Sequence, residues 1–299
     1  MRRLNLVAAL AAVLWSVVGV AGAGSPGQIL DAYRAASGGD AWNGKSALEA
    51  DYTLHNNGLN GTAHTLTDLA SGRSIARAKL GPLSGANGYD GNISWDMDQN
   101  GTVTPREGGD AKELAVNQAY RSTNVWWRAD RGGAGIVASE KTGNGKSFDV
   151  LTVTPKGGKP FDAWFDKKSH LLVEIVEQEG SRTVTTRFAD YTVFAGVKLP
   201  RQTVVDNGYG EEYRQTMTLT EAAFVATPPA SAFAPPKSQA NDFEIAGGAT
   251  ETSLPFKLIG GHIYGTVKIN GHGPVSAVFD TGGDRKSTRL NSSHSRASR

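Results

Sequence analysis

Short segments of alternating apolar and polar residues, broken by Gly and Asn, fill most of the chain from Ala47 to about Phe224. Alternation with a period of two places every second side chain on one face, which is typical of half-buried β-strands. The sequence therefore predicts a mainly β (α+β) fold, with one large curved antiparallel sheet and one or two helices. The expected strands or hairpin arms are LEADYTLH, GTAHTLTDLA, SIARAKL, NISWDMD, GTVTP, SFDVLTVTP, PFDAWFDKKSHLLVEIVEQEG, RTVTTRFADYTVFAGVKLPRQTVVD and YRQTMTLTEAAF.

Two stretches have helical spacing instead. Ser25-Pro26 reads as an N-cap followed by a proline in the first helical turn, and SGGD closes that helix. The second helix is expected from Ala111 to about Thr123. The Trp126-Trp127 pair that follows is expected to anchor this helix to the sheet or to line an apolar ligand cavity.

The first 23 residues have the layout of a secretory signal peptide. A basic start is followed by an apolar run from Leu6 to Val20, and cleavage is expected after Ala23. The run is short for the alternative, a membrane anchor. The chain has no cysteine, so it has neither the lipidation site of a bacterial lipoprotein nor a disulfide. We expect an exported bacterial protein, periplasmic or secreted, and the net charge of +2 gives no argument for nucleic acid as a partner.

The segment from Phe161 to Val205 resembles the bacterial outer-membrane lipoprotein carrier proteins (LolA/LolB-like) and their relatives. The resemblance depends on WFD before a strand and on the pattern F-x-D-Y-x-x-F-x-G-V-x-L-P, in which Gly196 and Pro200 punctuate a hairpin. It implies an unclosed antiparallel half-barrel that wraps around a helix and can hold acyl chains. We expect this domain to cover residues 24–230.

A Pro-, Ala-, Ser- and Gly-rich stretch follows and is expected to be an interdomain linker over residues 231–255. Beyond it, residues 256–283 contain alternating strand residues, an Asn270-Gly271 turn signal and a return strand from Val275 to Phe279. This hairpin runs into the triplet Asp280-Thr281-Gly282.

A strand ending in Asp-Thr-Gly resembles the start of the catalytic domain of retropepsin-like aspartic peptidases, an all-β domain. The resemblance implies that Asp280 is a catalytic carboxylate, that Thr281 braces the opposite loop and that Gly282 permits the tight turn. In that family two aspartates share a proton, and one activates water while the other protonates the peptide carbonyl, without a metal or cofactor. The alternative is a β-turn with an incidental aspartate.

A second motif, DMDQNGTVTPRE at residues 96–107, matches the pattern of a calcium-binding loop. Its context does not fit, because YDGNISW before it has the pattern of a strand and Pro105 precedes the position of the exit helix. We therefore expect a β-hairpin, and no metal site.

Residues 284–294, DRKSTRLNSSH, match the translation of a common sequencing adapter, so residues 284–299 are expected to be an artefact. The alternative is a natural Ser/Arg-rich tail. With the artefact removed, the chain is interpreted as the N-terminal part of an exported aspartic endopeptidase, inactive as given because its catalytic domain is truncated. A missing lobe or a second subunit would supply the second aspartate, and the substrate would be a peptide or protein. The other interpretation is a periplasmic lipid- or lipoprotein-binding protein without catalytic activity.

Overall fold

The computed structural model describes residues 24–143, 145–238, 245–248 and 251–279. The chain divides into two compact units, the first ending at Asn241 and the second beginning at Asp242. The expected signal peptide (1–23) and the expected artefact (284–299) lie outside the described residues. Within those residues, neither helix has the length and apolarity needed to cross a membrane.

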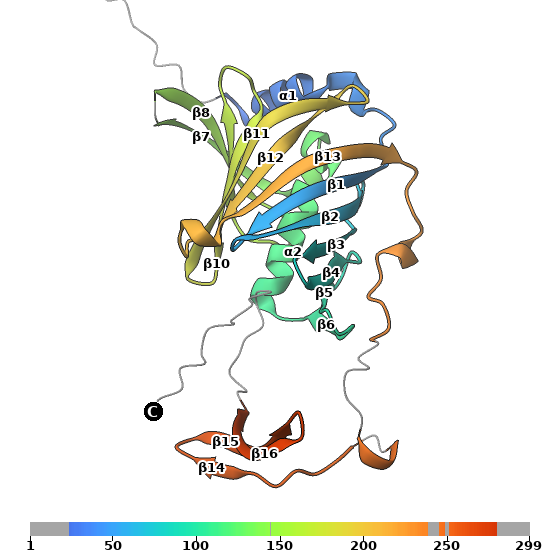
Figure 1. Cartoon of the computed structure of the whole chain (residues 1–299). Helices are drawn as coiled ribbons and strands as arrows, with labels where there is room; N and C mark the ends of the chain where they lie inside the picture. The colour runs from blue at the N-terminus through green and yellow to red at the C-terminus, as the bar shows by residue number, and fades with distance from the viewer. Residues whose placement is uncertain (1–23, 144, 239–244, 249–250, 280–299) are drawn as a thin grey trace, which may run out of the picture. The chain divides into compact units, whose positions relative to one another are not determined.

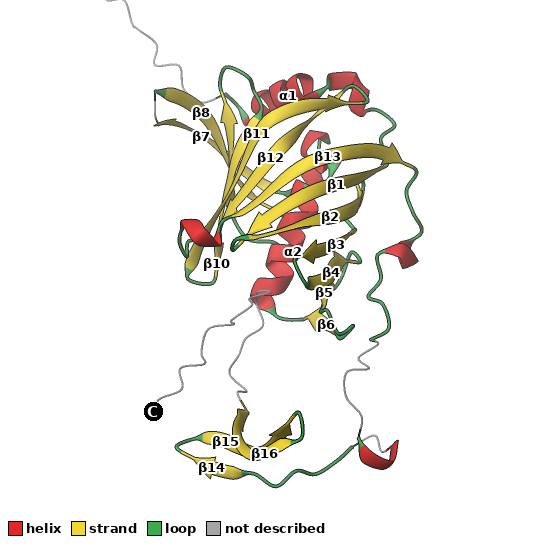
Figure 2. Cartoon of the chain, viewed as in Figure 1, coloured by secondary structure: helices red, strands yellow, loops and turns green. Residues whose placement is uncertain are grey.

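The first unit is an antiparallel sheet of thirteen strands that curves around the helix α2, with the helix α1 along one end (Figures 1 and 2). This confirms the predicted fold class. The sheet order is β6-β5-β4-β3-β2-β1-β13-β12-β11-β10-β9-β8-β7, so the sheet stays open between β6 and β7. The strands are β1 (Ala47–Asn56), β2 (Leu59–Asp68), β3 (Ser74–Leu80), β4 (Leu83–Tyr89), β5 (Ser94–Met97), β6 (Val103–Arg106), β7 (Gly135–Gly143), β8 (Lys146–Thr154), β9 (Phe161–Asp166), β10 (Leu172–Glu179), β11 (Arg182–Phe194), β12 (Val197–Asp206) and β13 (Gln215–Val225).

Both predicted helices form. α1 (Pro26–Ser37) begins with a capping box, in which the Ser25 hydroxyl accepts from the backbone N–H of Gln28 and the Gln28 side chain accepts from the backbone N–H of Ser25. α2 (Gly109–Arg121) begins two residues earlier than the spacing predicts. Short 3₁₀ turns include η1 (Gly39–Trp42), η2 (Asn124–Trp127) and η5 (Ala230–Ala232).

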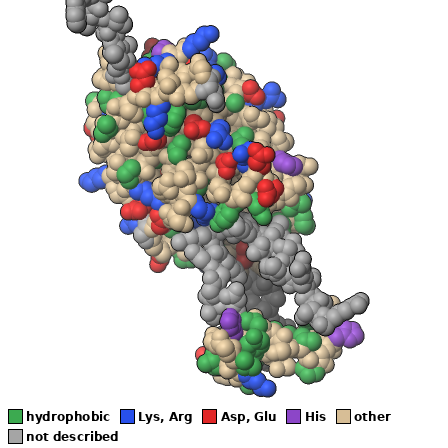
Figure 3. Space-filling view, turned by 90° about the vertical axis from the view of Figure 1, so that its left-hand side faces the viewer, with side chains coloured by type: hydrophobic (Ala, Val, Ile, Leu, Met, Phe, Trp, Pro, Cys, Tyr) green, Lys and Arg blue, Asp and Glu red, His purple; other side chains and the backbone are tan. Residues whose placement is uncertain are grey.

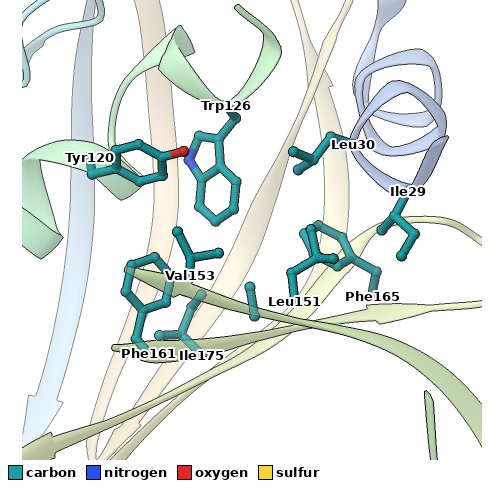
Figure 4. Packing of buried hydrophobic residues seen from close by; sticks show 10 residues of the cluster. Ile29, Leu30, Tyr120, Trp126, Leu151, Val153, Phe161, Phe165 and Ile175 are labelled. Carbon is teal, nitrogen blue, oxygen red and sulfur yellow. The ribbon is translucent and has the colours of Figure 1, made fainter. Parts of the chain in front are cut away.

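The main core lies between the helices and one face of the sheet, which we call the inner face and which carries Ala163 and Ile175 (Figure 4). Trp126 is 3% exposed, and its Nε1 donates to the carbonyl oxygen of Arg121 over 3.2 Å. This tryptophan therefore anchors the end of α2 to the sheet, which is one of the two roles predicted for the pair. The buried residues of the cluster are Ile29, Leu30, Tyr120, Trp126, Leu151, Val153, Phe161, Ala163, Phe165 and Ile175.

The segment after β13 packs on the opposite, outer face, against β3 and β5. The Phe233 side chain is fully buried with Ile75 and Trp95, and the Trp95 Nε1 donates to the Phe233 carbonyl oxygen over 3.1 Å. The Arg73 guanidinium lies 5.3 Å from the centroid of the Phe233 ring. The range expected to be a linker, residues 231–255, thus includes residues that belong to the core of the first unit, because one aromatic anchor outweighs the Pro- and Ala-rich composition around it.

β4 and β7 are two strands that the alternation does not predict. β4 contains Gly85 and Gly88, and glycine weakens a strand pattern. Packing requires the second of these, because a Cβ on Gly88 would lie 2.6 Å from the indole ring of Trp95. Gly88 therefore weakens the strand pattern in the sequence and, in the structure, leaves room for the Trp95 ring to lie across β4.

The residues with the calcium-loop pattern form a hairpin of β5 and β6, as predicted. Asp98 closes the turn, since its carboxylate accepts from the backbone N–H groups of Asn100 (2.9 Å) and Thr102 (3.0 Å). Asp96 forms an ion pair with Arg106 on the partner strand. Two of the carboxylates that a calcium loop would use are therefore engaged in stabilising the hairpin.

The second unit is a three-stranded antiparallel sheet in the order β14-β15-β16. Its strands are β14 (Lys257–Ile259), β15 (His262–Ile269) and β16 (His272–Phe279). The predicted turn is confirmed, with Asn270 at φ 51° and Gly271 at φ 79°, as a tight hairpin of this type requires. None of the described residues of this sheet is fully buried, and Leu258 is 68% exposed.

Candidate functional site

The residues with predicted catalytic roles, Asp280, Thr281 and Gly282, lie outside the described residues. The strand that leads to them does form, since β16 ends at Phe279. The described part of the chain therefore offers its candidate site elsewhere, on the inner face of the large sheet.

Five aromatic side chains on this face form a chain of touching rings that we call the inner aromatic cluster. Trp127 lies at its centre, 4.9 Å from Trp42 and 6.0 Å from Tyr33 between ring centroids. The Tyr33 ring continues to Phe165 at 5.2 Å, and the Trp42 ring continues to Phe224 at 5.9 Å. Because the rings come from α1, η1, η2, β9 and β13, the cluster joins parts of the inner face that are far apart in the sheet order.

The indole N–H of Trp127 is buried and has no hydrogen-bond partner among the described residues. Other inner-face indoles are satisfied: Trp126 donates to a carbonyl oxygen, and Trp42 Nε1 donates to Ser37 Oγ over 3.1 Å. A buried donor without an acceptor costs about 1–3 kcal/mol. The centre of the cluster therefore contains a polar group that an acceptor on a bound molecule can satisfy.

The remaining polar groups of the cluster are a neutral phenol and a cation. Burial raises the pKa of Tyr33 to about 12, so its hydroxyl remains protonated at neutral pH. The half-buried Lys45 holds its Nζ 4.7 Å from the centroid of the Phe224 ring. The cluster thus combines apolar surface with one buried donor and one neighbouring positive charge.

A buried polar network ties α2 to β10. Asn117 is fully buried and its Nδ2 donates to Glu177 Oε2 over 3.3 Å, while Arg121 Nη1 lies 2.5 Å from Glu177 Oε1. Burial, and after it the charge on Glu177, raises the pKa of Glu179. Since the carboxylate of Glu177 is paired and hydrogen-bonded, it holds α2 in position over the inner face.

Two open hollows lie on the surface of the first unit, and charged side chains line both of them. One has a volume of about 670 Å³ and is lined by Lys146, Asp166 and their neighbours at the ends of two hairpins. The other, of about 590 Å³, lies on the outer face and contains His64, whose ring nitrogens lie 3.1 Å from Glu49 and 2.8 Å from Asp51. Over the described residues, no group of three or more His, Asp or Glu side chains is placed to hold a metal ion.

The sequence singles out Trp127 but not most of its partners. Tyr33 lies on the first helix and packs against the main core. Trp42 and Lys45 lie in the connection after that helix, where periodicity gives no information. The available signal is a large aromatic residue in the connection GGDAWNGK, because a tryptophan there needs an apolar surface to pack against.

No protein-family model matches the sequence, and no curated protein matches it. Among solved structures, the chain is similar to a LolA superfamily protein, NE2245 from Nitrosomonas europaea, with 11% identity and a TM-score of 0.45 over 69% of this chain and 96% of that one. It is also similar to a DUF1329 family protein from Desulfovibrio piger, with 13% identity and a TM-score of 0.45 over the same shares. MucB matches with 12% identity and a TM-score of 0.25, over 71% of this chain and 62% of that one. At these TM-scores none of the three assigns a function to this chain.

Proposed function

We propose that the first unit is an exported binding module that holds an acyl chain of a lipid or lipidated protein against the inner aromatic cluster. The observation that carries the proposal is the buried N–H of Trp127, which lacks an acceptor among the described residues and belongs to a ring that contacts both Tyr33 and Trp42. The signal-peptide pattern of residues 1–23 supports export to the periplasm.

The chemistry of the cluster favours a ligand with a long apolar part and an oxygen acceptor. Alkyl chains gain about 0.8 kcal/mol for each methylene removed from water, and aromatic rings offer a large apolar surface for them. A carboxyl, ester or amide oxygen would accept from Trp127 Nε1, and a negative head group would gain from Lys45. The same groups provide neither a nucleophile nor a general base, so binding without chemistry is the function that they support.

The test uses the mature chain, purified without added lipid and examined by native mass spectrometry, together with displacement of a fluorescent fatty acid. Trp127→Phe keeps a six-membered aromatic ring but removes the N–H with the five-membered ring, so we expect affinity to fall about threefold to tenfold. Trp164→Phe is the matched control, because Trp164 Nε1 is also buried without a described partner but its ring packs on the outer face with Phe148. Apo protein that binds no fatty acid, or equal losses in both variants, would refute the proposal.

A second candidate function, peptide-bond hydrolysis by an aspartate pair, is favoured by one observation: β16 ends directly before Asp280. We propose this activity only for a protein that continues past Gly283 into the rest of a catalytic domain. The test is cleavage of an unstructured protein substrate by such a chain, carried out with and without Asp280→Asn. Cleavage that survives this substitution would remove the assignment and leave lipid binding unaffected.

A further inference from the structure

The two free edges of the large sheet differ in how they are protected. β6 has four residues, contains Pro105, and its Val103 N–H donates to the Ser238 hydroxyl of the segment after β13. β7 has nine residues and pairs with β8 from Gly135 to Gly143 without a bulge. No described strand pairs with its other side. A long regular edge without proline or bulge can add a further strand, which most natural edges are built to prevent.

β7 carries two charged residues, and charge is the usual protection for an edge, but both are engaged by their own sheet. Glu140 lies 2.8 Å from Lys167, and Lys141 lies 3.6 Å from Asp162. An incoming strand therefore meets neutralised pairs. It also meets Val137, which is 67% exposed and so gains from being covered.

We propose that β7 pairs in antiparallel orientation with β7 of a second copy of this chain, about a two-fold axis through Ser139. A two-fold axis perpendicular to the sheet keeps the inner faces of both copies on the same side. Odd-numbered residues of one copy can therefore lie opposite only odd-numbered residues of the other, and even-numbered opposite even-numbered. Centring on Ser139 places Val137 opposite Lys141 of the second copy and Ala138 opposite its Glu140. Moving the centre by one residue to Glu140 would set two glutamates against each other, which is unfavourable.

The chemistry of the edge favours a second copy over an unrelated extended peptide. In the proposed register no like charges lie opposite, and the added strand covers the exposed Val137 of each copy. Figure 3, viewed from the side on which β7 and β8 lie in Figure 1, shows basic and acidic side chains interspersed. A surface of mixed sign does not repel an identical surface.

The first test uses the absence of cysteine from the chain. Ser139→Cys places two thiols opposite each other at the axis, where Cβ atoms of an antiparallel pair lie about 4.5–5.5 Å apart. Mild oxidation, or a short thiol-reactive linker, should give a covalent dimer at low protein concentration. Thr104→Cys on β6, also exposed and also on an edge, is the matched control and should remain monomeric.

The second test changes affinity in both directions, measured by sedimentation velocity over a wide range of concentration. Ser139→Lys opposes two lysines at the axis and should weaken the dimer about fivefold. Val137→Glu creates two new pairs with the partner's Lys141 and should strengthen it about fivefold. A monomeric wild-type chain, or a dimer that responds to neither substitution, would overturn the proposal whatever the outcome of the lipid-binding test.

Discussion

Phe233 is expected to be the most costly single side chain to remove from the segment that follows β13. Its ring is fully buried on the outer face, against Ile75 and Trp95, and its backbone oxygen accepts from the Trp95 indole. Phe233→Ala leaves the hydrogen bond possible but empties the space that the ring fills. The change therefore measures how firmly this segment belongs to the first unit.

The expected magnitude follows from the burial of the ring. Truncating a core phenylalanine to alanine costs about 3–5 kcal/mol, and the Arg73 contact with the ring contributes about 0.5–1 kcal/mol of that. The segment is held by few other anchors, so it can detach while the sheet stays folded. The loss in the free energy of unfolding cannot then exceed the free energy with which the segment packs on the sheet. We expect the free energy of unfolding to fall by about 3 kcal/mol, at the lower end of the range.

The assay is urea unfolding followed by tryptophan fluorescence, for which Trp95 is a local reporter. Phe256→Ala is the matched control, because Phe256 is 62% exposed in the second unit and its loss should change stability by less than about 0.5 kcal/mol. If the segment detaches in the variant, the denaturant dependence should also decrease, since less surface is then buried in the native state. A loss below about 1 kcal/mol for Phe233→Ala would refute the assignment of this segment to the core.

Three further predictions concern the first unit. Arg121→Met leaves the buried Glu177 carboxylate unpaired and should cost about 3–5 kcal/mol in urea unfolding, most of which a second change, Glu177→Leu, should restore. Hydrogen bonds from a backbone amide and then a guanidinium lower the pKa of Asp206. Its contribution to the free energy of unfolding is therefore present above the ordinary pKa of 3.8 and is lost as pH falls through the lower folded-state pKa. The difference in stability between wild type and Asp206→Asn should close over that acidic range. Gly72→Ala would set a Cβ 2.6 Å from α2 at a φ of 76° and should cost more than about 1 kcal/mol in thermal unfolding, whereas Gly44→Ala, at φ 74° with open space, should cost less.

The local part of the fold can be predicted from the sequence because strand alternation and turn chemistry are local properties. The segment from Phe161 to Asp206 forms the strands β9 to β12 in the expected order, and each pairs with its neighbour along the chain. The pairing of β1 with β13 could not be predicted, since it joins residues such as Ala50 and Ala222 that are far apart in sequence. The alternation predicts on which face of the sheet a side chain lies, but it does not predict which distant strand pairs with the strand that carries it.

The candidate site is predictable to a smaller extent, for the same reason. Trp127 is conspicuous in the sequence as half of a tryptophan pair, and the two alternatives for that pair separate in the structure: Trp126 anchors the helix, whereas Trp127 joins the inner aromatic cluster. Whether an indole N–H finds an acceptor depends on side chains from five elements at once. No spacing rule contains that information, so an unsatisfied donor can be found only in three dimensions.

The two units differ in how well their side chains are packed, and the two proposed functions depend on this packing in different ways. Binding needs a surface that is already ordered, and the first unit has one, because Tyr33 belongs to α1 and Phe165 packs against the buried Trp126. Catalysis by an aspartate needs a carboxylate held rigidly in a dry environment. The three-stranded sheet of the second unit exposes Leu258 and Phe279 by 68% and 53%, so its described residues do not provide that environment. Loss of lipid binding through Trp127 and loss of cleavage through Asp280 should therefore be independent, and a variant at either position should leave the other activity unchanged.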